Sequence, residues 1–354
     1  MKTFRNLYPE IYTFKNLYAA FLKAKKYKRQ SRDALEFEYY LERNLFRLQD
    51  ELKELTFLPR RPKKLIVYEP VKRIISCPSF RDRVIQQALL QVIASIFECS
   101  FIYDSYAFRV GKGTHSALKR FDSFKRRTAP RRFPNGGFIL KADIKSYYPC
   151  VDHAVLISLI EKKIKDSQVI GLIKRFLENH SLGGKGICVG GPLSQLFANI
   201  YLSELDYYVK GILKEKFYLR YCDDFFVLKK KRESLEKVKA QIEAFLKQRL
   251  CLELNKDKTG ITTSNKGVDL LGYKSFYFYR LLRKRNVRSF KKRVSYWQEQ
   301  FKENKISLRD ITRSIRGWIE YAKYADSYKL RKKLFRVNLF TRMTEVKKNK
   351  RELP

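Results

Sequence analysis

The stretch RYCDDFFVL, Arg220–Leu228, places two adjacent aspartates between aromatic and apolar residues. Tyrosine, phenylalanine and valine favour extended backbone, so the pattern predicts two short strands joined through Asp223 and Asp224. Two carboxylates about 4 Å apart repel each other by about 4 kcal/mol at an effective dielectric constant of about 20. A packed hairpin tolerates such a pair if one carboxyl group is protonated or if a divalent cation lies between them.

A third carboxylate stands in a similar setting. Asp143 ends the run FILKAD, Phe138–Asp143, which is also predicted to be a strand. If the two segments are neighbours in one sheet, Asp143 joins Asp223 and Asp224. A set of hard oxygen ligands with no nitrogen or sulfur ligand favours Mg²⁺, with Mn²⁺ as a substitute. Three carboxylates can hold two such ions, a site that activates a hydroxyl nucleophile and stabilises leaving pyrophosphate in phosphoryl transfer.

The charge of the chain favours a polyanionic partner. Its 354 residues include 77 Lys and Arg but 36 Asp and Glu, a formal net charge of +41. Because phosphate neutralisation releases counterions, nucleic acid is the expected partner, and a merely solvated basic surface is the plain alternative. No apolar run approaches the about 18 residues of a membrane-spanning helix, so no membrane partner is expected. Six scattered cysteines without a CxxC pair indicate reduced thiols and a cytoplasmic location.

For the rest of the chain, the sequence predicts helices first, then a mixture of helices and strands, and then basic helices at the C-terminal end. The periodicity predicts helices over Leu35–Leu55, Arg81–Glu98, Asp152–Ile164 with Asp152 as its cap, Pro192–Leu213 and Arg232–Leu250. Strands are expected on both sides of a turn within Lys63–Ser79, and again in the run GVDLLGYKSFYFY, Gly267–Tyr279. Basic helices follow up to about Lys348.

Four segments together resemble the reverse transcriptases. They are YCDD (221–224), KADIKSYYPCVDH (141–153), GGPLSQLFANIYLSELD (190–206) and GVDLLGYKSF (267–276), in the order typical of that family. The resemblance implies an α+β fold of the right-hand polymerase type. It divides the chain into an N-terminal helical segment (1–60), fingers (61–140), a palm with an antiparallel sheet (141–280) and a helical thumb with a basic tail (281–354). It also implies an RNA-directed DNA polymerase with an RNA template, an RNA–DNA hybrid and deoxynucleoside triphosphates as partners.

One motif, CVGGPLSQ (188–195), narrows the resemblance to the reverse transcriptases of diversity-generating retroelements. Most reverse transcriptases have Gln and Pro where CVGGPLSQ has Val189 and Gln195, and the segment Val67–Leu89 is also similar to that subfamily. This implies error-prone copying of a template-repeat RNA at adenines in a bacterial or phage-infected cell. A small basic accessory variability protein, oligomeric in form, is the implied protein partner. The alternatives are a reverse transcriptase of a retron, group II intron or phage-defence system, and a non-catalytic RNA-binding scaffold with a polymerase-like fold.

The resemblance assigns roles around the reacting atoms. Asp143, Asp223 and Asp224 carry over as catalytic metal ligands, and the backbone of Ile144 is expected to face a metal. Lys258 falls where related polymerases place a lysine that protonates pyrophosphate; a solvated loop lysine is the alternative.

The resemblance also assigns residues that would contact the incoming nucleotide and the nucleic acid. Tyr148 falls at the position that excludes a 2′-hydroxyl, with an ordinary core tyrosine as the alternative. Nucleotide contacts are also expected from Lys72, Arg73, Val189, Gly190 and Gln195. Nucleic-acid contacts are expected from Arg81, Arg83, Gly272, Tyr273, Arg283, Lys284, Arg285, Arg288, Lys291 and Lys292. We also hypothesise that Val189, which cannot donate the hydrogen bond of a glutamine, admits mispairs at template adenines.

Overall fold

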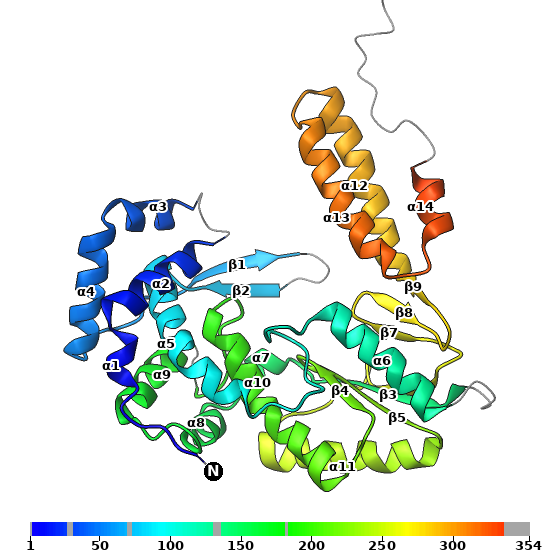
Figure 1. Ribbon diagram of the computed structural model, residues 1–354, viewed down its shortest axis with the longest axis horizontal. Helices are drawn as coiled ribbons and strands as arrows, with labels where there is room; N and C mark the ends of the chain where they lie inside the picture. Colours follow the sequence, from blue (N-terminus) through cyan, green and yellow to red (C-terminus); the bar gives the residue numbers. More distant parts are fainter. Residues whose placement is uncertain (1, 27–30, 69–72, 130–135, 181–182, 336–354) are drawn as a thin grey trace, which may run out of the picture. The chain divides into compact units, whose positions relative to one another are not determined.

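The computed structural model describes residues 2–26, 31–68, 73–129, 136–180 and 183–335 (Figure 1). The chain divides into two compact units: Met1–Gly113, Leu140–Val227 and Glu233–Gly260 form the first, and Thr114–Ile139, Leu228–Arg232 and Ile261–Pro354 form the second. The predicted mixed class of helix and sheet is confirmed. The division into four parts stays a prediction.

The elements follow the predicted order. The helices are α1 (Tyr8–Ile11), α2 (Phe14–Lys25), α3 (Arg32–Tyr39), α4 (Leu41–Lys53), α5 (Phe80–Glu98), α6 (Thr114–Thr128), α7 (Tyr147–Cys150), α8 (His153–Glu161), α9 (Ser167–His180), α10 (Pro192–Tyr207), the π-helix η2 (Tyr208–Ile212), α11 (Arg232–Leu250), α12 (Lys284–Lys302), α13 (Leu308–Lys323) and α14 (Tyr328–Leu334). The strands are β1 (Lys63–Val67), β2 (Arg73–Cys77), β3 (Phe138–Asp143), β4 (Tyr218–Tyr221), β5 (Asp224–Lys229), β6 (Gly260–Thr263), β7 (Val268–Leu270), β8 (Tyr273–Ser275) and β9 (Arg280–Leu282).

The N-terminal helices pack on α5, which also contacts α10. The single helix predicted over Leu35–Leu55 is wrong, because α3 ends at Tyr39 and α4 begins at Leu41, and Tyr40 between them has φ −108° and ψ 40°. The Asn44 side-chain amide donates to the Phe37 carbonyl (3.0 Å), which satisfies one of the acceptors exposed at the end of α3. Phe37 of α3 packs edge-on against Phe80 of α5.

A four-stranded sheet in the order β4-β5-β3-β6 carries the predicted site. β4 and β5 pair antiparallel from Tyr218 with Val227 to Tyr221 with Asp224. Tyr218, Leu219 and Phe225–Leu228 are buried, so both faces of this hairpin are packed. The prediction that the strand of Asp143 neighbours the strand of Asp224 is confirmed, since β3 lies next to β5.

Two helix starts near the site follow simple capping rules. The Asp152 carboxylate accepts a hydrogen bond from the Val155 N–H (3.1 Å), so the predicted cap of α8 is confirmed. α10 begins at Pro192, a position where the missing N–H costs nothing. The ordinary helix ends at Tyr207 and continues as the π-helix η2, so the predicted helix to Leu213 changes type over its last turn.

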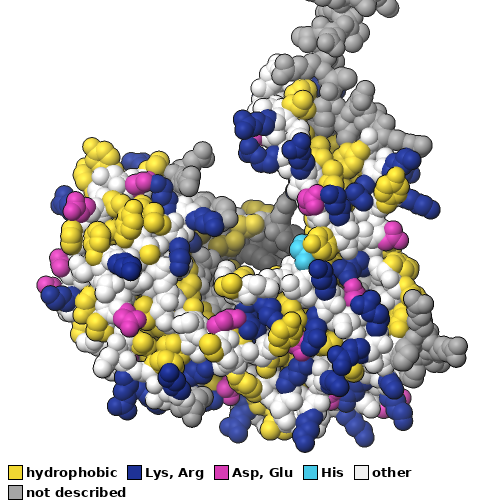
Figure 2. All heavy atoms as spheres, viewed as in Figure 1, with side chains coloured by type: hydrophobic (Ala, Val, Ile, Leu, Met, Phe, Trp, Pro, Cys, Tyr) yellow, Lys and Arg dark blue, Asp and Glu magenta, His cyan; other side chains and the backbone are white. Residues whose placement is uncertain are grey.

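The second unit combines the three-stranded sheet β7-β8-β9 with α6 and α12–α14. α12 and α13 lie side by side, and their Phe290 and Trp318 rings stack at 3.8 Å between centroids (Figure 1). The Lys125 ammonium is buried and donates to the Ser275 hydroxyl (2.9 Å), which ties α6 to β8. None of the helices in the described ranges is both apolar enough and long enough to span a bilayer. Figure 2 shows lysine and arginine side chains spread over the visible surface with fewer acidic ones between them.

Candidate active site

The paired aspartates lie at a tight hairpin. The last pair of β4 and β5 is Tyr221 with Asp224, which leaves Cys222 and Asp223 as the loop between the strands. Cys222 has φ 57°, a left-handed conformation that residues other than glycine rarely adopt. The predicted strand–turn–strand arrangement is confirmed, and it places Asp223 in the loop and Asp224 at the start of a strand.

Asp143 ends β3 and is 7% exposed. The chain around Lys258 runs beside it, since the Asn255 N–H donates to the Asp143 carbonyl (2.8 Å) and the Asp143 N–H donates to the Thr259 hydroxyl (3.3 Å). A turn in which the Asn255 carbonyl accepts from the N–H groups of Lys258 (3.2 Å) and Thr259 (2.9 Å) directs the lysine back toward the strand. Lys258 Nζ lies 2.9 Å from Asp143 Oδ2. Two predicted site residues 115 positions apart are therefore in direct contact.

The pKa values of the two aspartates at the hairpin are raised. Burial raises the pKa of Asp223, and the neighbouring Asp143 carboxylate raises it further. Burial, with smaller contributions from Asp223 and Asp143, raises the pKa of Asp224 to about 6, although Lys141 and Lys258 oppose the shift. A cation placed among these groups would favour their ionised forms. A bound cation would therefore stabilise the ionised aspartates of this site.

The donor set suits a hard divalent ion. Asp143, Asp223 and Asp224 offer carboxylate oxygens, the ligands that Mg²⁺ and Mn²⁺ prefer. Among the residues that the structure describes, no group of three or more His, Cys, Asp or Glu side chains is drawn together closely enough to hold an ion as it stands. The Lys258 ammonium, bound to Asp143 Oδ2, supplies a positive charge in direct contact with this carboxylate. The three carboxylates are therefore ligands of the type that a divalent ion prefers. The Asp143 carboxylate already binds a cationic group, the Lys258 ammonium.

The chain matches the family described as reverse transcriptase (RNA-dependent DNA polymerase) over residues 62–275, which is more than half of its length. The chain belongs to the reverse transcriptase family. The motifs and the antiparallel hairpin that carried the resemblance all lie within or beside the matched residues, and the predicted family is confirmed. Reverse transcriptase domains generally use divalent metal ions, which agrees with the carboxylate oxygens that Asp143 offers at the end of β3 and that Asp223 and Asp224 offer at the hairpin.

Two curated relatives illustrate the similarity. The group II intron-encoded protein LtrA of Lactococcus lactis subsp. cremoris is 28% identical, over 66% of this chain and 50% of the relative. Protein YkfC of Escherichia coli strain K12 is 26% identical, over 68% of this chain and 71% of the relative. The chain therefore spans about half the length of the intron-encoded protein. Among solved structures, apo telomerase from Candida tropicalis truncated from its C-terminal domain aligns with a TM-score of 0.48 at 15% identity, over 66% of this chain and 58% of that chain.

The reverse transcriptase hairpin has a tyrosine behind it. The Tyr148 hydroxyl lies 3.9 Å from Cys222 Sγ in the loop, and burial raises the pKa of Tyr148. Its neighbour Tyr147 is buried and donates to the Ala198 carbonyl (2.6 Å) on α10. Of the two adjacent tyrosines, Tyr147 is the core residue and Tyr148 the one beside the aspartate loop. This placement agrees with the nucleotide-facing role predicted for Tyr148, which stays a prediction.

The backbone of Ile144 lies at the same edge. Ile144 forms an isolated antiparallel bridge with Leu254, and its neighbours Asp143 and Lys145 make the two flanking backbone hydrogen bonds. The Ile144 side chain is buried, so its contribution to a site can come only from the main chain. The predicted backbone role is compatible with this geometry and stays untested.

The motif that contains Gly190 lies against β2. Gly190 has φ 122°, and a Cβ there would lie 3.1 Å from the Ser76 carbonyl oxygen, so only glycine fits without strain. The Arg83 guanidinium donates to the Gly190 carbonyl (3.3 Å). A residue predicted to contact nucleic acid is therefore bonded to one predicted to contact the nucleotide. Val189 is half-buried and Gln195 is exposed at the first turn of α10.

The basic residues predicted in the fingers separate into different settings. Arg81 is mostly buried and is paired with Glu51 and Asp82, and burial lowers the pKa of Arg81. The charge of Arg81 is therefore balanced within the unit by the carboxylates of Glu51 and Asp82, and a nucleic-acid contact of Arg83 stays a prediction. Lys72 lies outside the described residues, and Arg73 is described only as the first residue of β2.

The second unit holds the remaining predicted nucleic-acid contacts. Gly272 has φ 92°, and a Cβ there would lie 2.6 Å from the Tyr321 hydroxyl, so the turn before β8 requires glycine. Tyr273 is fully buried and donates to the Tyr321 carbonyl (2.8 Å), so its ring and hydroxyl belong to the core of this unit. Arg283 is half-buried and paired with Asp269. The exposed cations at the start of α12 are Lys284, Arg285, Arg288, Lys291 and Lys292.

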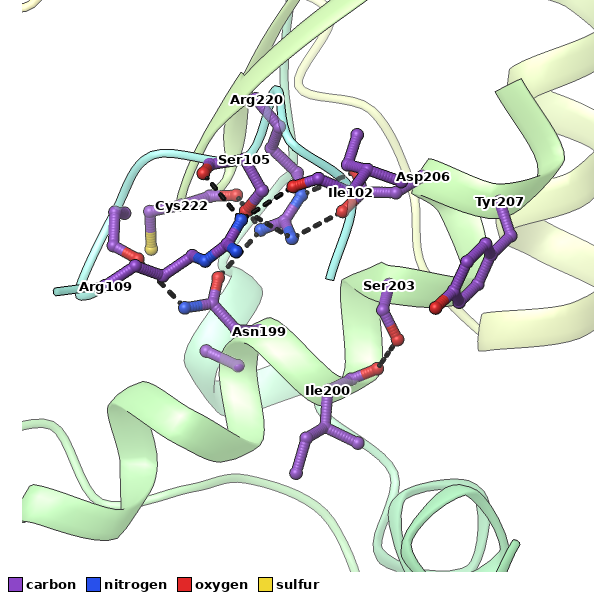
Figure 3. A network of polar contacts seen from close by, with 12 residues as sticks. Ile102, Ser105, Arg109, Asn199, Ile200, Ser203, Asp206, Tyr207, Arg220 and Cys222 are labelled. Carbon is purple, nitrogen blue, oxygen red and sulfur yellow. Dashed lines mark hydrogen bonds and ion pairs between the residues drawn. The ribbon is translucent and has the colours of Figure 1, made fainter. Parts of the chain in front are cut away.

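The sequence analysis missed one group of residues beneath the hairpin. Arg220 and Asp206 form an ion pair in which both side chains are fully buried, and Arg220 also donates to Asn199 and Ser105 (Figure 3). The only signal in the sequence was the arginine itself, a charged residue within a predicted buried strand. Its partners lie on α10 and in a loop, and no local pattern connects them to Arg220.

Proposed function

We propose that this reverse transcriptase is an RNA-directed DNA polymerase that adds deoxynucleotides to a primer 3′-hydroxyl on an RNA template. The observation that carries the proposal is the convergence of Asp143 and the Asp223 loop, with Lys258 in contact with Asp143. The chain spans only about half of its intron-encoded relative, so the proposal concerns the polymerase reaction of this chain.

The three carboxylates would hold the divalent ions, two Mg²⁺ in the proposed form. Bound ions would supply positive charge to the primer hydroxyl and to the triphosphate, which is how metals assist phosphoryl transfer. Asp143 and Asp224 come from adjacent strands, while Asp223 sits in the loop that joins β4 and β5. A rigid sheet under the carboxylates keeps the reacting groups in line, which is the main protein contribution to such a reaction. Lys258 would give its proton to the leaving pyrophosphate.

The substrate roles follow from position around the hairpin. Tyr148 beside Cys222 would pack under the sugar and reject a 2′-hydroxyl. Gly190, with its positive φ and open surface, allows close approach of a base pair to the backbone. The exposed cations of α12 would meet the phosphates of the RNA template and the RNA–DNA hybrid.

We further propose that the enzyme belongs to a diversity-generating retroelement. Val189 and Gln195 in the box before and within α10 support the proposal, because most reverse transcriptases carry Gln and Pro there. The product would be cDNA of a template-repeat RNA with errors at adenines. An accessory variability protein, basic and oligomeric, would be the partner in the cytoplasm, and the RNA would help to join two basic proteins.

A group II intron-type enzyme is the second candidate function. The curated relatives favour it, since the group II intron-encoded protein LtrA is 28% identical over 66% of this chain. The two candidates differ in their templates. Paired repeats near the gene that differ only at adenines would support the retroelement, and a flanking intron RNA would support the other candidate.

The polymerase proposal is tested by primer extension with the full chain, an RNA template and Mg²⁺, in the presence and absence of RNA copied from the flanking genomic DNA. Asp223→Asn should abolish extension because it removes a proposed metal ligand, whereas Asp257→Asn, in the exposed turn beside Lys258, should extend like the wild type. RNA binding without extension in every reaction would support the scaffold alternative. Equal extension by Asp223→Asn and the wild type would refute the assignment of the site.

A further inference from the structure

Arg220, the first residue of the hairpin stretch, is fully buried under the loop that carries Asp223. An arginine side chain has five N–H groups, and each one here has an acceptor (Figure 3). Nε donates to Asp206 Oδ1 (2.8 Å), Nη2 to Asp206 Oδ2 (2.7 Å) and Ser105 Oγ (3.1 Å), and Nη1 to Asn199 Oδ1 (3.1 Å) and the Cys222 carbonyl (3.0 Å). Burial alone would lower the pKa of Arg220, but the Asp206 carboxylate outweighs it and raises that pKa, so the group stays cationic.

The acceptors come from two other elements of the same unit. Asn199 and Asp206 are seven residues apart on α10, two helical turns, and therefore share one face. Ser105 belongs to a segment that runs beside β4, where the Arg220 N–H donates to the Asp104 carbonyl (3.0 Å) and Ser105 bridges Arg220 in parallel register. The guanidinium thus joins α10, this segment and the hairpin at one point.

One of the five bonds reaches the catalytic loop. The Cys222 carbonyl belongs to the peptide bond between Cys222 and Asp223, so Arg220 Nη1 fixes the plane of the peptide that leads into Asp223. The bond acts where Cys222 adopts φ 57°, a conformation that a cysteine does not favour by itself. The other four bonds hold α10 and the neighbouring segment, and would persist if this loop peptide rotated.

We propose that Arg220 is a positioning residue. Its Nη1 hydrogen bond to the Cys222 carbonyl fixes the Cys222–Asp223 peptide and so orients the Asp223 carboxylate. Its kinetic consequence rests on the proposed polymerase function, whereas its structural consequence does not. Arginine is suited to the task because its planar fork binds Asp206 with two N–H groups and still presents Nη1 to the loop. A lysine has a single nitrogen and cannot span both partners.

The test compares Arg220→Lys with a matched substitution, Arg109→Lys, in the full chain. Arg109 Nε donates to Glu98 Oε1 (2.7 Å), and its Nη1 donates to the carbonyls of Ile102 (2.6 Å) and Ser105 (2.9 Å). It therefore holds the same segment as Arg220, as Figure 3 shows, but none of these bonds reaches the hairpin. General loosening of the segment should appear in both variants, and loss of loop positioning in Arg220→Lys alone.

Cys222 is a native reporter of the loop. Its alkylation by iodoacetamide is followed by peptide mass analysis, with the exposed Cys99 and Cys251 as internal standards. Arg220→Lys should raise the Cys222 rate at least about tenfold relative to the standards, because a bond from a charged donor is lost. In primer extension, kcat should fall about 100-fold while KM for primer–template stays within about threefold, because misplaced reacting groups lower the rate of chemistry. Arg109→Lys should change neither quantity.

A second variant keeps the test decisive if Arg220→Lys does not fold. Arg220→Met combined with Asp206→Leu and Tyr218→Phe replaces the buried pair, and the hydroxyl that donates to Asp206 (2.7 Å), by apolar side chains, an exchange that buried ion pairs often tolerate. It should show the same gain in Cys222 reactivity and the same loss of kcat. A folded variant with wild-type Cys222 protection overturns the positioning role. Absence of extension by the wild-type chain would instead count against the proposed function and leave the alkylation result to decide on Arg220.

Discussion

Removing the Lys258 ammonium separates a structural role from a chemical one. In Lys258→Met the methylene stem remains and the 2.9 Å contact with Asp143 Oδ2 is lost. The Lys258 side chain is 57% exposed and that of Asp143 10% exposed, so water already screens the pair. Ion pairs of this kind contribute up to about 1 kcal/mol to stability. The free energy of unfolding should therefore fall by no more than about 1 kcal/mol.

The effect on the reaction should be far larger. A side chain that transfers a proton in the transition state contributes about 10²–10⁴-fold to the rate, so Lys258→Met should slow nucleotide addition by at least about 100-fold. Lys258→Arg distinguishes proton transfer from simple charge. A guanidinium keeps a positive charge near Asp143 but does not give up its proton, so it should restore stability without restoring the rate.

The assay is single-turnover primer extension by rapid quench at saturating nucleotide and Mg²⁺, alongside urea unfolding of each variant. Lys256→Met is the matched control, because Lys256 is an exposed lysine in the same turn. It should leave both the rate and the stability unchanged. A wild-type rate for Lys258→Met would refute the role of Lys258, and a full rate for Lys258→Arg would show that it contributes charge rather than a proton.

Three further predictions concern other residues of the palm. Asp206→Asn leaves the Arg220 cation buried and unpaired, so urea unfolding should show a loss of about 3–5 kcal/mol, and a loss under about 1 kcal/mol would contradict the buried pair. Tyr148→Val should raise the incorporation of ribonucleotides relative to deoxynucleotides at least about tenfold in single-nucleotide extension, because the ring beside the loop is removed; unchanged selectivity would exclude the sugar-excluding role. Val189→Gln should lower misincorporation opposite template adenines when the cDNA is sequenced, and an unchanged error rate there would count against the hypothesis on Val189.

The parts of the fold that depend on local pattern were predictable from the sequence. Aromatic and β-branched residues on both sides of Asp223 indicated a hairpin, and the structure has its turn at that residue. Asp152 was recognised as a helix cap because capping depends on residues within one turn. The break at Tyr40 was missed, because both flanking segments favour helix and the stop is stabilised by the Asn44 amide contact with the Phe37 carbonyl.

The parts of the site that depend on distant contacts were only partly predictable. Motif order suggested that Asp143 and Asp223 meet, but nothing local indicated that Lys258 binds Asp143 across 115 positions. The pair of Arg220 and Asp206 was invisible for the same reason, since a buried charge is recognised only when its partner is known. Family resemblance supplied the proposed catalytic residues, and the structure supplied the buried Arg220, which contacts the loop that carries Asp223.

The central claim is that Asp143, Asp223 and Asp224 gather divalent ions at the palm hairpin. The most direct test is the anomalous scattering of Mn²⁺ in crystals of the full chain with an RNA template, a primer lacking its 3′-hydroxyl and a deoxynucleoside triphosphate. The account predicts Mn²⁺ bound to the carboxylate oxygens of Asp143 and Asp223, with Lys258 moved from Asp143 toward the triphosphate. Mn²⁺ bound elsewhere, with Asp143 still paired to Lys258 and distant from Asp223, would contradict it.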